Sequence, residues 1–287
     1  MKKTIDTKGI AWFLIITFGL TIGLAVYLKS TGHTLADGKF DPVVTFSLAG
    51  AMFIPAITSV FVRLFITKEG FKDAGLKWGK WKYYGQTWLV ILLLFILVFG
   101  LTALFIKRPD LSLGLFTAKY GLELPMPAYQ MIMLVSFSTL FLAPIINMLP
   151  SFGEELGWRG FLLPKLLPLG YRKALIIHGI IWGLWHSPFV ILLGFAYGNT
   201  SILSALIFTM IITFLGIYFG WLRLISGSVW LPTFAHAVFN AHSYGIWRIL
   251  FPDINPYLGG VTGLIGFFTF YLFSFFILNK VKKILVV

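Results

Sequence analysis

Long apolar segments follow one another along this chain and limit the folds it can adopt more than any other feature. Eight can be delimited, and each holds enough residues, about 20, to cross the roughly 30 Å hydrocarbon layer of a bilayer as a helix. They cover residues 10–28, 43–66, 84–106, 129–163, 174–195, 202–222, 229–247 and 257–278. Backbone polar groups inside lipid must be hydrogen-bonded within the protein, which favours helices. The predicted fold class is therefore all-α: a polytopic membrane protein with about eight transmembrane helices and a single domain covering residues 1–287.

Composition supports this class and excludes others. Hydrophobic residues make up 58% of the 287 residues and charged residues only 11%, whereas about a quarter of a soluble domain is charged. The formal net charge of +13 does not indicate nucleic-acid binding, because the basic residues gather in short connecting segments, as membrane orientation requires. The absence of cysteine excludes disulfides, thiol nucleophiles and cysteine-ligated metal sites.

The basic residues also predict an orientation in the cell membrane. They are concentrated at Lys2, Lys3 and Lys8, in the aromatic segment 68–82, and near the C-terminus. An even number of spans with both termini in the cytoplasm places most of them on the cytoplasmic side, in agreement with the positive-inside rule. The first apolar segment is longer than a signal-peptide core and lacks a small-residue cleavage site, so we expect it to be retained as a span.

Two glutamates and an arginine occur together within apolar sequence, in a chain with only ten acidic residues. Ionisable groups inside a membrane are costly and usually functional. On a helix, Glu155 and Arg159 are four residues apart and share a face, whereas Glu154 points about 100° away. This spacing predicts that Arg159 neutralises Glu155 and assigns the chemistry to Glu154. Arg159 is expected to lie only ~7 Å deep and to direct its charge toward the interface.

The segment that carries these residues, 129–163, is too long for one perpendicular crossing. Pro144 and Pro150 are expected to break or bend it, because proline removes a helical hydrogen bond. An alternative interpretation ends the span at Leu149 and puts both glutamates at the water surface, where they would cap a peripheral helix.

Further polar residues occur at similar depths in two other segments. At 1.5 Å per residue, Glu154 lies ~15 Å from the cytoplasmic end of its span, His186 ~20 Å, and His236 and Asn240 ~13 and ~20 Å. His236 and Asn240 are four residues apart and share a helical face. We therefore expect these side chains to form one polar layer within the membrane. Their chemistry suits the attack of a water molecule on a carbonyl group. Glu154 would take the proton from water, His186 would hold that water, and His236 and Asn240 would donate hydrogen bonds to the oxyanion.

These residues resemble the three motifs of the CAAX-processing and bacteriocin-processing (CPBP, Abi) family of intramembrane proteases. The pattern Glu-Glu-x-x-x-Arg matches at residues 154–159, Phe-x-x-x-His at 182–186 and His-x-x-x-Asn at 236–240. Order and spacing agree over residues 129–245, the predicted catalytic core. Trp182 stands where the pattern has phenylalanine, and its larger ring is expected to narrow the cavity.

The resemblance implies an eight-helix fold and hydrolysis of a peptide bond in a membrane-associated peptide or protein, by CAAX-type or bacteriocin-precursor processing. It assigns catalysis to Glu154, His186, His236 and Asn240, with Glu155, Arg159 and Trp182 in support. The leading hypothesis requires no cofactor. A zinc-dependent variant would use Glu154, His186 and His236 as metal ligands, although no His-Glu-x-x-His motif is present. A proton-coupled transporter and a non-catalytic immunity protein are the alternatives from other classes.

Overall fold

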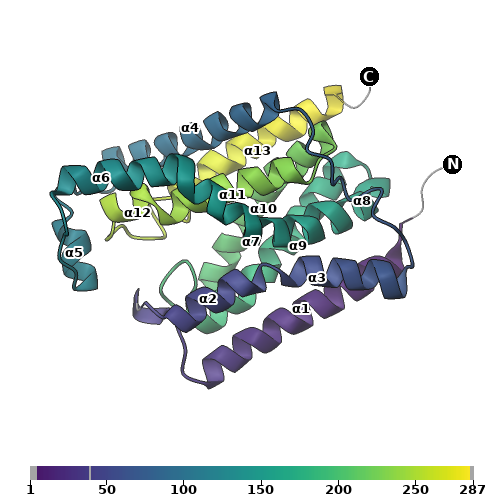
Figure 1. Ribbon diagram of the computed structural model, residues 1–287, viewed down its shortest axis with the longest axis horizontal. Coiled ribbons are helices and arrows are strands. Elements are labelled where there is room, and N and C mark those ends of the chain that lie inside the picture. Colours follow the sequence, from purple (N-terminus) through teal and green to yellow (C-terminus); the bar gives the residue numbers. More distant parts are fainter. Residues whose placement is uncertain (1–4, 39, 285–287) are drawn as a thin grey trace. The chain divides into compact units, whose positions relative to one another are not determined.

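The computed structural model describes residues 5–38 and 40–284, and throughout this part of the chain the regular structure is helical, without strands (Figure 1). Lys2 and Lys3, used above for orientation, lie outside the described residues. Six helical stretches are long and apolar enough to cross a membrane: Thr7–Ser30, Pro42–Ile66, Lys82–Phe105, Ala128–Leu169, Tyr171–Leu193 and Ile202–Ser226. The all-α multi-pass membrane class is thereby confirmed. The orientation of the termini stays a prediction.

The last two predicted spans are shorter than expected. The helix α11 covers Trp230–Tyr244, and α13 covers Leu264–Ile284, of which Leu264–Lys280 is the described apolar part. The residues from Tyr257 to Gly263, predicted to begin the eighth span, form turns instead. Gly260 has φ +68°, a left-handed conformation that a helix does not contain.

The chain forms two compact units. The first comprises Met1–Lys80, Pro150–Thr233 and Phe270–Val287, and the second Trp81–Leu149 and Phe234–Thr269. The first unit contains α1 (Thr7–Ser30), α2 (Pro42–Ala51), α3 (Ile54–Phe61), α8 (Leu163–Leu166), α9 (Tyr171–Leu193) and α10 (Ile202–Ser226), with π-helical turns at Val62–Ile66 and Trp158–Leu162 and 3₁₀ turns at Ala36–Gly38 and Leu167–Leu169. The second contains α4 (Lys82–Phe105), α5 (Gly114–Tyr120), α6 (Ala128–Phe137), a π-helical turn at Ser138–Leu142 and α12 (Ile246–Leu250).

Three helices continue from one unit into the other: α7 (Ala143–Gly157), α11 and α13. The predicted single domain is not tested by this division and stays a prediction. Within the first unit, α1 packs on α3 and on α9 (Figure 1), and α9 packs on α10.

The long fourth apolar run accommodates its prolines without ending the helix. Pro144 has no N–H, so the carbonyl of Leu140 cannot receive the usual helical hydrogen bond. In the second unit the Trp88 indole N–H donates to that carbonyl at 3.0 Å, and the π-helical turn Ser138–Leu142 provides the local adjustment. Pro150 lies inside α7. Of the two expected effects, a break at Pro150 does not occur, and α7 carries both glutamates in its last turn.

Glycines allow α9 and α10 to approach closely. A Cβ added to Gly179 would lie 2.6 Å from the carbonyl oxygen of Thr213, and one added to Gly183 would lie 2.6 Å from that of Thr209. Both contacts are with backbone atoms, which cannot move without displacing α10. Small residues at this four-residue spacing are the usual means of close helix packing in membranes.

We expect Gly179→Ala to destabilise the protein, because the added methyl group meets backbone, at a cost of about 1–3 kcal/mol. Gly19→Ala on α1 is the matched control, since no atom lies within 4 Å of its added Cβ and alanine is favoured over glycine in a helix by about 1 kcal/mol. Thermal unfolding in detergent measures both variants. Equal midpoints for the two would contradict the packing described for Gly179.

An ion cluster anchors the first helix. The Asp6 carboxylate accepts a hydrogen bond from the Gly9 N–H at the start of α1 and a salt bridge from Lys165 Nζ at 2.7 Å, and Lys165 also pairs with Glu69 at 2.7 Å. Partial burial alone would raise the pKa of Asp6, but the hydrogen bond from Lys165, that from Gly9 and the charges of Lys165 and Lys8 together lower it below 3.8.

We expect Asp6→Asn to lose stability at neutral pH but not in acid. Asparagine is an equally good helix N-cap, so the change removes the ion pair and keeps the cap. A lowered pKa in the folded state stabilises the protein at pH values above the usual 3.8, and this contribution is lost as the pH falls through the folded-state value. Thermal unfolding of both proteins across this range tests the expectation. A difference between them that does not change with pH would contradict it.

Candidate active site

The two adjacent glutamates have different partners, and that of Glu155 is Arg159. Arg159 Nη1 donates to Glu155 Oε1 at 2.8 Å, and both side chains are completely buried. This is the predicted i,i+4 pair on one helical face. The π-helical turn Trp158–Leu162 begins directly after α7 and contains Arg159. Turns of this kind occur frequently at functional sites.

The Arg159 guanidinium does not extend toward the interface. It lies over the Trp182 ring at 4.0 Å from the centroid and over the Phe219 ring at 5.3 Å. The expectation that its charge reaches the membrane surface is therefore wrong. The physical reason is that aromatic rings from α9 and α10 cover the π-helical turn, and their faces attract the cation.

Glu154 meets a different partner. The Trp182 indole N–H donates to Glu154 Oε2 at 2.7 Å, and the Glu154 side chain is 3% exposed. The alternative in which both glutamates cap a peripheral helix at the water surface is contradicted by this burial. Within the first unit, Glu155 pairs with an arginine, whereas Glu154 accepts a neutral N–H from the motif on α9.

His186 lies one turn beyond Trp182 on α9. Its Nδ1 is 2.8 Å from the Trp182 carbonyl oxygen. Because a carbonyl can only accept, this contact assigns the proton to Nδ1, and in the neutral ring Nε2 then carries the lone pair. The rings of Trp185 and Phe208 contact the imidazole edge to face, with centroid distances of 4.8 and 5.4 Å. This hydrogen bond and the aromatic packing orient His186.

His236 and Asn240 belong to the second unit, on α11. They are four residues apart in one continuous helix, as expected, and His236 is buried at 5% exposure. The structure does not test whether they meet Glu154 and His186, so the complete set of four stays a prediction.

Comparison with known proteins identifies the segment that contains all of these residues. Residues 133–242 match the family model described as Type II CAAX prenyl endopeptidase Rce1-like. This segment is similar to that family. A relative, CAAX prenyl protease 2 of Methanococcus maripaludis, is 36% identical over 94 residues, which are 31% of this chain and 35% of that protein. The chain therefore matches about a third of the length of this curated relative, and the resemblance to the CAAX-processing family is confirmed over this segment.

The π-helical turn that contains Arg159 also has a supporting residue from outside the matched segment, which the sequence analysis missed. Arg63, at the end of the second apolar run, is buried at 1% exposure. Its Nη2 donates to the carbonyl of Gly160 at 2.9 Å, inside the π-helical turn that carries Arg159, and its Nη1 pairs with Asp73 at 2.8 Å. The signal in the sequence was an arginine three residues before the end of an apolar run, followed by acids at 69 and 73.

The zinc alternative uses Glu154, His186 and His236 as metal ligands. Among the residues that the structure describes, no group of three or more histidine, aspartate or glutamate side chains is arranged to hold a metal ion. In the first unit, Glu154 and His186 are of the types that ligate zinc, and His186 has its Nδ1 on a backbone carbonyl, as zinc-ligating histidines commonly do. The third ligand of the zinc alternative, His236, belongs to the second unit. Zinc therefore stays a prediction.

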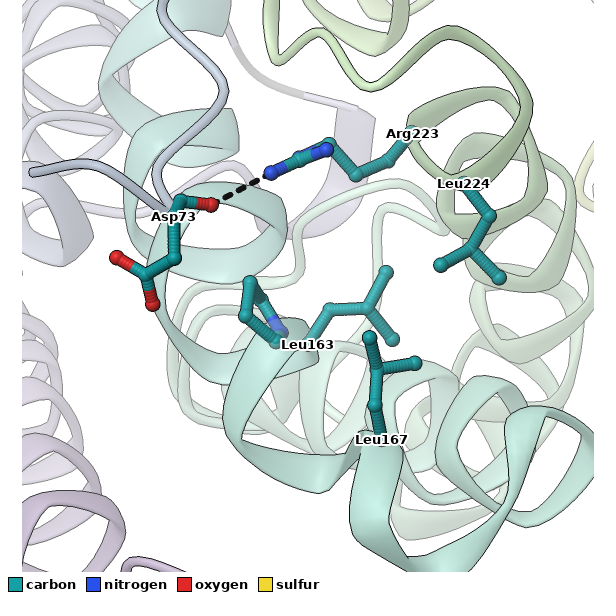
Figure 2. A pocket seen from close by; sticks show the side chains of 6 residues that line it. Asp73, Leu163, Leu167, Arg223 and Leu224 are labelled. Atoms are coloured by element: carbon teal, nitrogen blue, oxygen red, sulfur yellow. Dashed lines mark hydrogen bonds between the residues drawn. The ribbon is translucent and has the colours of Figure 1, made fainter. Parts of the chain in front are cut away.

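A cavity of about 210 Å³ lies elsewhere in the first unit (Figure 2). Its lining is mainly apolar, with Leu163, Leu167 and Leu224, and Figure 2 shows the Arg223 side chain reaching the backbone oxygen of Asp73, to which Nη2 donates at 2.6 Å. None of the predicted catalytic residues lines this cavity. It is therefore not assigned to the reaction.

Proposed function

We propose that this protein is a membrane-embedded endopeptidase that hydrolyses a peptide bond of a membrane-associated peptide or protein, with water activated by Glu154. The observation that carries the proposal is that the two adjacent glutamates have different hydrogen-bond partners. Glu155 is paired with Arg159, while the buried Glu154 carboxylate accepts a hydrogen bond from Trp182 on the helix that carries His186. The Rce1-like match over residues 133–242 supports the same reaction class.

In the proposed reaction, Glu154 takes one proton from a water molecule, and the resulting hydroxide attacks the carbonyl carbon of the substrate. His186 Nε2 accepts a hydrogen bond from the same water and orients it. His236 and Asn240 donate hydrogen bonds to the oxyanion of the tetrahedral intermediate. Glu154 then returns the proton to the leaving amine as the C–N bond breaks, so that the enzyme ends in its starting state.

Two substrate classes fit the proposal. The curated relative is named as a CAAX prenyl protease, which suggests cleavage near the C-terminus of a prenylated protein. Processing of a bacteriocin or other peptide precursor is the second class. Both place the scissile bond close to the bilayer, where the buried carboxylate lies within a helix of the spanning segment Ala128–Leu169. We propose no nucleic-acid partner.

The reaction as proposed requires no metal. In the zinc-dependent alternative, Glu154, His186 and His236 would hold the ion, which would polarise the carbonyl and lower the pKa of the bound water. Metal analysis of purified, active protein distinguishes the two forms. Activity that survives complete removal of zinc supports the metal-free form, and activity that disappears with zinc and returns on its addition supports the alternative.

The function is tested by mass spectrometry of membrane peptides from cells that produce either the wild-type protein or Glu154→Gln. The expected result is a product peptide that appears only with the wild type and a precursor that accumulates with the variant. Glu123→Gln is the control, because Glu123 is exposed in a connecting segment. Identical peptide profiles for wild type and Glu154→Gln would contradict the endopeptidase. Proton flux into liposomes that depends on Glu154 without any cleavage would favour the transporter instead.

A further inference from the structure

We propose that Trp182 is a positioning residue, whose indole N–H fixes the orientation of the Glu154 carboxylate for proton transfer. This inference rests on the proposed function. The contacts of Trp182 carry it. Its indole N–H donates to Glu154 Oε2 at 2.7 Å, its ring face lies 4.0 Å from the Arg159 guanidinium, and its carbonyl is 2.8 Å from His186 Nδ1.

The indole itself is held in a fixed place. Trp182 is 1% exposed, and its ring contacts Phe219 on α10 at a centroid distance of 5.7 Å. A Cβ added to Gly216 would lie 3.2 Å from Trp182 Cε3, closer than most real contacts of this kind. The glycine at 216 therefore leaves the space that the larger ring occupies. A donor that cannot move sets the direction of its acceptor, here the carboxylate of Glu154.

This role requires tryptophan and not merely an aromatic residue. Phenylalanine, which the family pattern has at this position, would keep an aromatic face for Arg159 and the same backbone carbonyl for His186. It has no N–H, so the hydrogen bond to Glu154 would be lost. Hydrogen bonds to charged groups contribute roughly 1.5–3 kcal/mol, and the indole can donate but not accept. Tryptophan at position 182, where the pattern has phenylalanine, therefore adds a charge-assisted hydrogen bond to the packing that an aromatic ring provides.

Trp182→Phe tests the inference. If the bond orients the proton acceptor in the transition state, kcat falls by about tenfold while KM stays near the wild-type value, since Trp182 is 1% exposed and offers almost no surface to a substrate. Trp88→Phe is the matched control, in the second unit. Its indole N–H donates to the backbone carbonyl of Leu140 at 3.0 Å and not to a predicted catalytic residue. The control is expected to retain the wild-type kcat, even if its thermal stability is lower.

A second measurement remains decisive if Trp182→Phe does not fold. In protein labelled with ¹⁵N-tryptophan, Glu154→Gln should move the indole signal of Trp182, because an amide oxygen is a weaker acceptor than a carboxylate. The Trp88 signal should stay unchanged, because its indole donates to the Leu140 carbonyl. A benzothiophene analogue of tryptophan at position 182 keeps the ring shape without the N–H and assigns the signal by its loss.

The outcomes separate this inference from the function on which it rests. If Glu154→Gln abolishes cleavage while a folded Trp182→Phe keeps the wild-type kcat, the positioning role is wrong and the endopeptidase stands. An unmoved Trp182 indole signal in Glu154→Gln also overturns the role. If Glu154→Gln cleaves at the wild-type rate, the proposed function itself is wrong, and the positioning role is wrong with it.

Discussion

Glu154→Gln is expected to lower kcat by about 10³-fold without unfolding the protein, within the range that loss of a general base usually costs. Glutamine has nearly the same size as glutamate, and its amide oxygen can still accept the hydrogen bond from the Trp182 indole. It cannot take a proton from water. The measurement is the cleavage rate of the precursor identified from membrane peptides, with purified protein in detergent or in a bilayer.

Thermal unfolding of the same preparation shows whether the variant is folded, and its midpoint should lie close to the wild-type value. The Glu123→Gln control should cleave at the wild-type rate, because it removes an exposed charge outside the apolar segments. A well-folded Glu154→Gln protein with unchanged kcat would show that Glu154 is not the general base and would contradict the proposed function.

The second large effect concerns stability. Arg159→Met should destabilise the protein by about 3–5 kcal/mol, or prevent its accumulation, because a buried carboxylate would lose its charged partner. Both members of the pair are completely buried, with Arg159 Nη1 2.8 Å from Glu155 Oε1. Methionine keeps part of the side-chain volume and removes the charge. Chemical unfolding in mixed detergent micelles gives the free-energy difference.

A double variant separates charge from packing. Glu155→Leu combined with Arg159→Met replaces the whole pair by apolar side chains, a change that is often nearly neutral for buried pairs, so it should recover much of the stability lost by Arg159→Met alone. Lys119→Met removes one partner of the partly exposed pair Lys119–Asp253 and should cost at most about 1 kcal/mol. A double variant no more stable than Arg159→Met, or an Arg159→Met protein as stable as the wild type, would contradict the account of the pair.

Much of the fold follows from the sequence because lipid imposes a simple requirement. An apolar run of about 20 residues has few alternatives to a spanning helix, and six predicted spans are found as helices of the required length. Helix ends were harder to place. Hydropathy does not distinguish an apolar turn from an apolar helix, so the turns around Gly260 were assigned to the eighth span, which begins instead at Leu264.

The site was predictable where a contact depends on helical spacing alone. The Glu155–Arg159 pair is of this kind, because residues four apart on a helix must be neighbours. The burial of the Arg159 guanidinium was not predictable in this way, because a distance counted along the chain does not reveal that rings from α9 and α10 cover the π-helical turn. The hydrogen bonds from Trp182 to Glu154 and from Arg63 to Gly160 join segments that are far apart in the sequence. A single sequence does not show which distant segments meet.

Cysteine cross-linking of helices α9 and α11 tests most directly whether Glu154, His186, His236 and Asn240 form one site. The chain has no cysteine, so introduced pairs can be joined without background. A short bifunctional thiol reagent, applied to membranes containing His186→Cys with His236→Cys, should link the two helices. The same reagent should not link Leu184→Cys with His236→Cys, because Leu184 is exposed on the surface of α9. Linkage of the control pair but not of the 186/236 pair would place the two histidines apart and contradict the proposed site.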